Sequence, residues 1–171
     1  ITHARLICLD DSSITTRPES EKNPPAPLTD SAAYIIFTSG STGKPKGVVV
    51  TNYALANHCL DCCNVYGLSA KDRVLQFSSF NFDAAFEQLF PALISGACLV
   101  MRDNEVWNTR EFADKLIDLQ LTVVDIPTAY WHQLVTEWAV NPGAVPNSRL
   151  RLLIVGGEAI SPEKVALWHK T

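Results

Sequence analysis

The sequence predicts an α/β protein whose mostly parallel sheet is flanked by helices on both faces. Short apolar runs alternate along the chain with longer segments of helical periodicity, and helix-start signals precede several of those segments. No fixed-length repeat interrupts the alternation. Strands joined by helical crossovers give such a pattern, and the helices then cover the sheet. In open sheets of this kind, ligands bind at the carboxyl ends of the strands.

The composition narrows the class of protein. The 171 residues are 47% hydrophobic and 19% charged, which favours a packed globular domain with its own core. The net charge is −4 and the basic residues are scattered, so we expect no nucleic-acid partner. No apolar run approaches the roughly 18 residues of a membrane span, and the first residues lack a secretion signal. The chain starts without methionine, and we expect it to be a piece of a longer protein.

The cysteines indicate a reducing compartment. Their number, five, is odd, which disfavours a disulfide framework and predicts a cytoplasmic location. Three of them, Cys59, Cys62 and Cys63, share one face of a predicted helix with Leu55 and Tyr66. Free cysteine behaves as a small buried hydrophobe. We therefore expect these residues to belong to the core, and we expect no metal site.

Two regions divide the chain. Residues 6–9 predict a short strand, and residues 12–30 are polar and proline-rich, which indicates an exposed connection. We expect residues 1–32 to form this leading strand and connection. Residues 33–171 are expected to form an α/β sub-domain.

The sub-domain begins with two strands and a helix. The apolar runs at 33–37 and 48–50 predict the strands. Asn52 is expected to cap a helix that reaches about Tyr66, where Gly67 ends it.

A strand and a second helix follow. The strand is expected at 73–77 and the helix at 83–94. Pro91 lies inside that helix and removes a backbone donor, which predicts a kink. The residues expected to face the core are Phe86, Leu89, Phe90 and Leu93.

The second half continues the alternation. Asn108 and Glu111 form a capping-box pattern that predicts a helix. Ser161 and Pro162 predict the start of a closing helix. The other expected features are strands at 97–100, 121–126 and 152–155, a helix at 127–138, and an inward helix face made of Phe112, Leu116 and Leu119.

The segment 38–47 combines glycines, hydroxyls and lysines directly after an apolar run. Glycine lets backbone N–H groups turn toward a ligand, and hydroxyl and ammonium groups complete a phosphate cradle. A P-loop does not fit, because that motif needs glycine where Thr38 stands and serine or threonine where Pro45 stands. A strand also follows, whereas a P-loop opens a helix. A flexible loop without a ligand is the alternative, although Pro45 would stiffen it.

The string Thr38-Ser39-Gly40-Ser41-Thr42-Gly43-Lys44-Pro45-Lys46-Gly47 resembles the signature of adenylate-forming, AMP-binding enzymes. These include acyl- and aryl-CoA ligases, luciferases and the adenylation domains of non-ribosomal peptide synthetases. The resemblance covers nearly all of 33–171 and implies a sub-domain of the family's N-terminal domain. It also implies that ATP is bound by this loop and by a later Gly-Gly-Glu turn, whose alternative role is an ordinary strand-to-helix turn. The implied ATP-binding residues are Thr38, Ser39, Gly40, Ser41, Thr42, Gly43, Lys46, Gly157 and Glu158.

The segment Phe82-Asp83-Ala84-Ala85 resembles the Phe-Asp-(Ala or Ser)-Ser segment of peptide-synthetase adenylation domains, with alanine at the last position. In that family the aspartate receives the α-ammonium group of an amino acid. The alternative is that Asp83 simply caps its helix. The resemblance implies a substrate pocket made of Phe82, Asp83, Ala84, Glu87, Asp125, Ile154 and Gly156.

Two further carboxylates would line that pocket. Glu87 lies one helical turn beyond Asp83 and therefore on the same face, and Asp125 ends a predicted strand. Because unpaired buried carboxylates are costly, we expect a basic substrate such as lysine or ornithine. The alternative is that Glu87 or Asp125 pairs with an arginine or lysine of the protein.

The resemblance also implies a reaction. The carboxylate of the amino acid attacks the α-phosphorus of ATP, pyrophosphate leaves, and Mg²⁺ shares the phosphate charge. The aminoacyl-adenylate then passes to the phosphopantetheine thiol of a peptidyl carrier domain. Catalysis of this kind is mainly positioning and charge neutralisation, so no catalytic residue beyond the phosphate loop is predicted here.

We expect the chain alone to be inactive. The family's later nucleotide-binding segments, and its C-terminal domain with a catalytic lysine, have no counterpart in this sequence. The remainder of the adenylation domain is therefore an expected partner. Two alternative functions stay open, namely a fragment of an acyl- or aryl-CoA ligase and a non-catalytic nucleotide-binding fragment.

Overall fold

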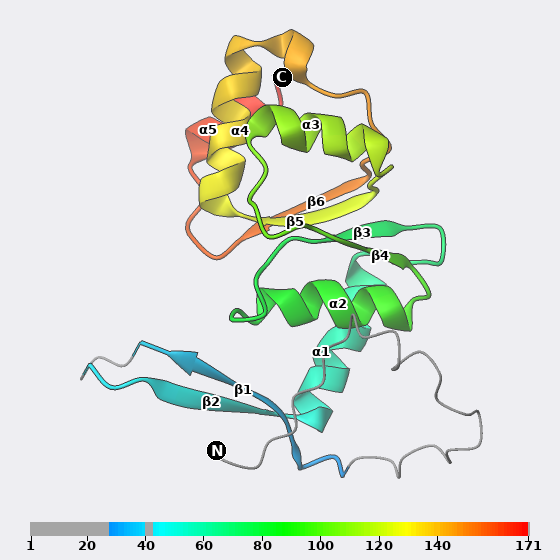
Figure 1. Cartoon of the computed structure of the whole chain (residues 1–171), viewed down its shortest axis with the longest axis vertical. Helices are drawn as coiled ribbons and strands as arrows, with labels where there is room; N and C mark the ends of the chain where they lie inside the picture. Colours follow the sequence, from blue (N-terminus) through cyan, green and yellow to red (C-terminus); the bar gives the residue numbers. More distant parts are fainter. Residues whose placement is uncertain (1–27, 40–42, 171) are drawn as a thin grey trace.

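A four-stranded parallel sheet forms the centre of the protein (Figure 1). The computed structural model describes residues 28–39 and 43–170. The strands lie in the order β4-β3-β5-β6, and every neighbouring pair is parallel. Their bounds are Arg73–Gln76 for β3, Cys98–Met101 for β4, Val123–Pro127 for β5 and Leu152–Gly156 for β6. The predicted strand at 6–9 and most of the predicted connection lie outside the described residues.

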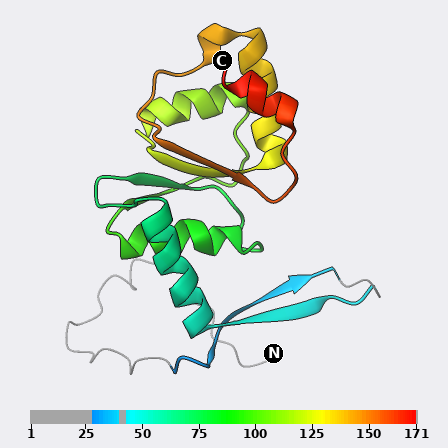
Figure 2. The same cartoon turned by 180° about the vertical axis from the view of Figure 1, so that it is seen from behind.

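Helices cover both faces of this sheet, which confirms the predicted fold class (Figures 1 and 2). One face carries α2, with α1 packed against it, and the other carries α3, α4 and α5. The bounds are Asn52–Val65 for α1, Ala84–Ile94 for α2, Thr109–Asp118 for α3, Thr128–Val140 for α4 and Pro162–Trp168 for α5, with a short 3₁₀ turn, η2, at Pro142–Ala144. Among the described residues, no helix combines the length and apolar character needed to cross a membrane.

An antiparallel hairpin lies against α1 and α2 as a sheet of its own (Figure 1). It pairs β1 (Ala32–Thr38) with β2 (Lys46–Thr51), in a register that sets Ile36 opposite Val48. The Tyr34 ring stacks on Phe86 of α2 with ring centroids 4.3 Å apart. The hairpin is thus anchored near its base, and its two strands flank the segment that the sequence predicts to bind phosphate.

The main core lies between the sheet and the α3–α4 layer. Phe112, Leu116 and Leu134 are no more than 1% exposed, and Trp138 is 4% exposed. The predicted capping box is present: Asn108 Oδ1 accepts from Glu111 N at 2.9 Å, and Glu111 Oε2 accepts from Asn108 N at 2.9 Å. Two orphan donors of the first turn are thereby satisfied.

Two local predictions are wrong. Thr51, not Asn52, caps α1, because its Oγ1 accepts from Ala54 N, while the Asn52 amide donates to Ser31 O and Ser31 Oγ. The predicted core face of α2 is also rotated. Leu93 is 56% exposed, and Phe86, Leu89 and Phe90 are only partly buried. The residues that pack inward are Ala85, Gln88, Pro91 and Ala92. Small side chains let α2 approach the sheet closely, which apolar periodicity did not reveal.

An ion pair with a buried carboxylate joins the amino ends of three strands. Asp72, 4% exposed, accepts from Arg151 Nε at 2.7 Å and from Arg151 Nη2 at 2.9 Å. Thr122 and Ser69 donate further hydrogen bonds to the same carboxylate. The Arg151 guanidinium also donates to the carbonyls of Tyr66 and Gly67 at the end of α1. These bonds hold the pKa of the Asp72 carboxyl well below its usual range, chiefly through Arg151.

Replacing this arginine should destabilise the protein markedly. Removing one partner of a buried ion pair costs roughly 3–5 kcal/mol, and we expect Arg151→Met to cost about 2–3 kcal/mol because its guanidinium is partly exposed. The neighbouring Arg149 is exposed, and Arg149→Met should change the free energy of unfolding by less than about 0.5 kcal/mol. Urea unfolding of both variants measures the difference, and equal losses would contradict the role given to the ion pair.

Candidate functional site

Four of the predicted substrate-site residues lie at or near the carboxyl ends of the strands, namely Phe82, Asp125, Ile154 and Gly156. Asp125 of β5 is in register with Ile154 of β6, and Pro127 is in register with Gly156. The turn that carries Phe82 and precedes α2 follows β3 at the same end of the sheet. The hairpin extends toward this side of the molecule in both views (Figures 1 and 2).

A buried glutamine connects these strand ends, and no pattern in the sequence indicated it. Gln88 is 2% exposed. Its Oε1 accepts from the N–H groups of Phe77 and Ser78 at 2.8 and 2.9 Å. Its Nε2 donates to the carbonyl of Asp125 at 3.1 Å and to Asp125 Oδ2 at 3.2 Å. One side chain thereby fixes the end of β3, the end of β5 and the position of α2.

Asp125 lies in a poorly solvated position. Burial raises the pKa of its carboxyl to about 6, the bond from Gln88 lowers it, and the negative charge of Glu87 raises it. Burial is the largest of these causes because it disfavours the charged form. The carboxyl of Asp125 therefore titrates closer to neutral pH than an ordinary aspartate does.

Asp83 and Glu87 line one cavity, as their helical spacing predicted. The cavity measures about 320 Å³, and its wall also includes Tyr34 and Val50 of the hairpin and His58 of α1. Asp125 is not part of that wall. Of the three predicted acids, Asp83 and Glu87 therefore share a cavity. Asp125 lies outside that cavity wall and is hydrogen-bonded to Gln88.

Asp83 is exposed, and its side chain caps only the adjacent residue of the helix. Its Oδ1 accepts from the N–H of the next residue, Ala84, at 3.0 Å. A typical N-cap side chain instead bonds the N–H two or three residues on. Phe82, just before it, is 64% exposed.

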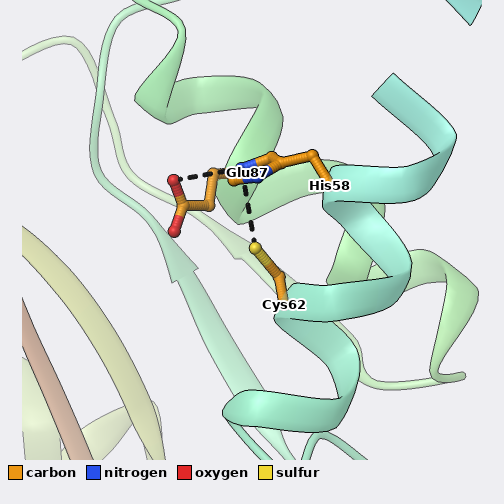
Figure 3. Close-up of side chains that lie close together, drawn as sticks. All are labelled: His58, Cys62 and Glu87. Atoms are coloured by element: carbon orange, nitrogen blue, oxygen red, sulfur yellow. Dashed lines mark hydrogen bonds and ion pairs between the residues drawn. The ribbon is translucent and has the colours of Figure 1, made fainter. Parts of the chain in front are cut away.

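Glu87 has partners on α1 that were not predicted. The Tyr66 hydroxyl donates to Glu87 Oε1, and His58 Nε2 lies 3.4 Å from Glu87 Oε2 (Figure 3). Burial is the main cause that raises the pKa of the Tyr66 hydroxyl, followed by its bond to Glu87. The weak signal was spacing: His58, Cys62 and Tyr66 recur every fourth residue of α1.

A buried threonine holds the Gly-Gly-Glu turn. Thr128 is fully buried, and its Oγ1 lies 3.0 Å from the carbonyl of Gly156 and 3.2 Å from that of Glu158. Gly157 has φ +91°, in the left-handed region that favours glycine. The turn thus has a fixed shape and an exposed outer surface, while Ile154 is partly buried beneath it.

The segment 38–47, which the sequence predicts to bind phosphate, is described at its two ends. Gly40, Ser41 and Thr42 lie outside the described residues. Thr38, Ser39, Gly43 and Lys46 are exposed, and Thr38 Oγ1 lies 3.5 Å from the carbonyl of Lys46 across the hairpin. Gly43 has φ +79°, a conformation that glycine adopts without strain.

The predicted cysteine face of α1 is confirmed. Cys59 and Cys62 are 1% and 5% exposed, and Leu55, Cys63 and Tyr66 are partly buried. Burial is also the first cause that raises the pKa of the Cys62 thiol, to about 11.

The parallel sheet, the hairpin and the turn that carries Phe82 and Asp83 agree with one family of proteins. The chain belongs to the AMP-binding enzymes, whose family profile matches residues 3–171.

The chain is similar to two curated synthases and to a solved NRPS structure. It is 39% identical over 161 residues to the isonitrile lipopeptide synthase of Streptomyces coeruleorubidus, covering 90% of this chain and 11% of that protein. It is 32% identical over 164 residues to tyrocidine synthase 1 of Brevibacillus parabrevis, covering 95% of this chain and 14% of that protein. The structure of PA1221, an NRPS protein containing adenylation and PCP domains, has a TM-score of 0.72 at 25% identity, covering 90% of this chain and 30% of that one. The chain thus spans a small part of the length of its relatives.

Loss of the Gln88 amide should destabilise the protein, because this side chain joins the strand ends at the candidate site. In Gln88→Leu, the N–H groups of Phe77 and Ser78 lose their acceptor, and we expect a loss of about 2–3 kcal/mol in the free energy of unfolding. Gln133 is exposed on α4, so Gln133→Leu serves as the matched control and should be nearly neutral. Urea titration compares them, and a Gln88→Leu variant as stable as the control would refute the assigned role.

Asp125 should make stability depend on pH. Its folded-state pKa of about 6 exceeds the ordinary 3.8, so folding takes up a proton between these values and stability falls as pH rises through that window. Asp125→Asn keeps an acceptor for Gln88 without this charge. Its stability relative to the wild type should therefore be about 2 kcal/mol more favourable at pH 7 than at pH 4.

Urea unfolding at the two pH values tests this expectation. Asp114→Asn, at an exposed position of α3, is the control and should show no such difference. A gain for Asp125→Asn that stays constant with pH would contradict the assignment.

Proposed function

We propose that this chain is part of an amino-acid adenylation domain, which uses ATP to convert an amino acid to an aminoacyl-adenylate. The observation that carries the proposal is the shared cavity, whose wall joins Asp83 to the two strands that lead into the phosphate loop. An ammonium group bound at Asp83 would hold the amino acid beside the nucleotide site. Membership of the AMP-binding family supports the nucleotide, and the similarity to peptide synthetases supports the amino acid.

Asp83 is suited to bind a cation. Its carboxylate is exposed, and its capping contact reaches only the adjacent N–H, so it is not committed to the standard cap. Asp83 precedes the first residue of α2, and the carboxylate lies at the amino end of that helix. Asp83 could therefore cap its helix and still bind the ammonium group of the substrate.

The phosphates of ATP would lie at the hairpin. Backbone N–H groups, the hydroxyls of Thr38 and Ser39, and the charge of Lys46 suit the leaving pyrophosphate. Mg²⁺ would share that charge when bound. The carboxylate oxygen of the amino acid forms a bond to the α-phosphorus, and the bond from that phosphorus to the bridging oxygen of pyrophosphate breaks.

The partner proposed for the next step is a peptidyl carrier domain with its phosphopantetheine thiol. PA1221, which the fold resembles, contains adenylation and PCP domains. The chain covers 30% of that structure, so the remaining part of an adenylation domain is a second proposed partner.

Within this function, we propose a basic amino acid such as lysine or ornithine. Asp83 and Glu87 line one cavity, and the described residues of its wall include no lysine or arginine. The alternative of a protein arginine or lysine paired with Glu87 therefore lacks support. Glu87 instead accepts a hydrogen bond from the Tyr66 hydroxyl and lies 3.4 Å from His58 Nε2, and it borders the cavity that the substrate would enter.

The test is ATP–pyrophosphate exchange by the longer protein that contains this chain, across amino acids and simple carboxylic acids. We expect lysine or ornithine to support the fastest exchange. In Glu87→Gln, the preference for lysine over norleucine should fall about fivefold, which corresponds to roughly 1 kcal/mol of lost attraction. Glu105→Gln, at an exposed position, should keep the preference.

Different outcomes of this experiment would refute the basic substrate, the amino-acid substrate or the catalytic function. Fastest exchange with a neutral amino acid would refute the basic substrate alone. Exchange only with acids that lack an amine would indicate a CoA ligase. Nucleotide binding without exchange would indicate a non-catalytic module.

A further inference from the structure

Three side chains with metal-binding atoms converge where α1 crosses α2. His58 and Cys62 lie one turn apart on α1, and Glu87 faces them from α2 (Figure 3). His58 Nε2, Cys62 Sγ and a carboxylate oxygen of Glu87 all lie within 4.8 Å of one another. Ligands four residues apart on one helix are a usual way to present two metal ligands to the same ion.

The two separations from His58 Nε2 match edges of a tetrahedral site, and the third, between Cys62 Sγ and the Glu87 carboxylate, is within 4.8 Å. Cys62 Sγ is 3.6 Å from His58 Nε2, and Glu87 Oε2 is 3.4 Å from the same nitrogen. With usual zinc–ligand bonds of about 2.0–2.3 Å, tetrahedral angles place sulfur about 3.6 Å and oxygen about 3.4 Å from the nitrogen. The side chains could therefore bind an ion with little rearrangement.

The carboxylate is already oriented for such a role. Tyr66 donates to Glu87 Oε1, which leaves Oε2 directed at His58. A hydrogen bond to the second oxygen is the usual outer-shell support of a metal-bound carboxylate. The Tyr66 hydroxyl therefore has a defined function in the cluster.

We propose that His58 Nε2, Cys62 Sγ and Glu87 Oε2 form a binding site for Zn²⁺. Nitrogen, sulfur and oxygen ligands together suit this borderline-soft ion better than Mg²⁺ or Ca²⁺, which prefer oxygen alone. The thiolate and the carboxylate balance the two positive charges. On binding, the thiol proton leaves to solvent and a zinc–sulfur bond forms, without any redox change.

The proposed zinc site is accessible from the cavity and has room for a fourth ligand on that side. Cys62 is 5% exposed, whereas the side chains of Glu87 and His58 are 27% and 55% exposed. His58 and Glu87 both line the 320 Å³ cavity, so a fourth ligand, water or a small molecule, would enter from that cavity. Structural zinc sites usually have four protein ligands, so a site with three protein ligands and one open position differs from them.

This inference goes beyond the proposed function, and it gives Glu87 a different partner from the basic substrate proposed above, because bound Zn²⁺ would balance the charge of that carboxylate. Its test needs no enzymatic turnover. The reduced, metal-free chain of residues 1–171 is titrated with Co²⁺ while the thiolate-to-cobalt charge-transfer band is recorded, and Zn²⁺ is then added. We expect one equivalent of Co²⁺ to produce the band and Zn²⁺ to remove it. No band, or a band that Zn²⁺ leaves in place, would overturn the proposal.

A second measurement on the unchanged protein identifies the sulfur. Alkylation of each cysteine is followed by peptide mass spectrometry with and without Zn²⁺. Zn²⁺ should slow the labelling of Cys62 at least about tenfold and leave the exposed Cys98 unaffected. Equal protection of both cysteines, or protection of Cys98 alone, would overturn the site.

Variants then test the three ligands. His58→Gln, Cys62→Ala and Glu87→Gln should each weaken Zn²⁺ binding at least about tenfold in calorimetry, whereas Cys98→Ala should bind as the wild type does. Far-ultraviolet circular dichroism confirms that each variant is folded, and the labelling of the wild type decides the question for any variant that is not. Unchanged affinity in a folded variant of any of the three ligands would overturn the proposed ligand set.

Discussion

The ion pair between Asp72 and Arg151 is the constraint on which the arrangement of the sheet depends. Arg151 precedes β6, Asp72 precedes β3, and Thr122, which also bonds Asp72, precedes β5. The pair therefore joins three strands at their amino ends. Because β3, β5 and β6 have nearly equal lengths of 4, 5 and 5 residues, aligning their starts also aligns their carboxyl ends, where the candidate site lies. The same guanidinium holds the last carbonyls of α1, so the helix that carries His58 is oriented from the same point.

Helix α2 combines structural and chemical roles at adjacent positions. Its inward face is small and apolar except for Gln88, which organises the strand ends. Its other face presents Asp83 and Glu87 to the cavity. Since neighbouring residues of a helix point about 100° apart, residues 87 and 88 serve different layers of the protein. A change that rotates α2 would therefore disturb the packing of the sheet and the acidic wall at once.

The sequence predicted the parts of the fold that local rules control. The alternation of elements, the capping box at Asn108 and Glu111, and the closing helix after Ser161 all depend on nearby residues, and the structure has them. It did not predict the face of α2, because close packing selects alanine and proline over the larger apolar residues beside them. It also missed Gln88 and Thr128, whose partners lie 10 to 37 and 28 to 30 positions away in the chain. Glu87 was expected in the pocket, but its bonds to α1 depend on how two helices cross, and no local pattern encodes that.

The hairpin has a consequence for local stability. It has only two strands, and Phe37, Val48 and Val49 are at least 50% exposed, so little burial holds it beyond the Tyr34–Phe86 contact at its base. Two-stranded sheets are marginally stable in water. Amide hydrogens of β1 and β2 should therefore exchange through local opening, much faster than those of β3 and β5, which unfold only with the core. Any phosphate compound bound between Thr38 and Lys46 would suppress this opening, and part of its intrinsic affinity would be used in ordering the strands.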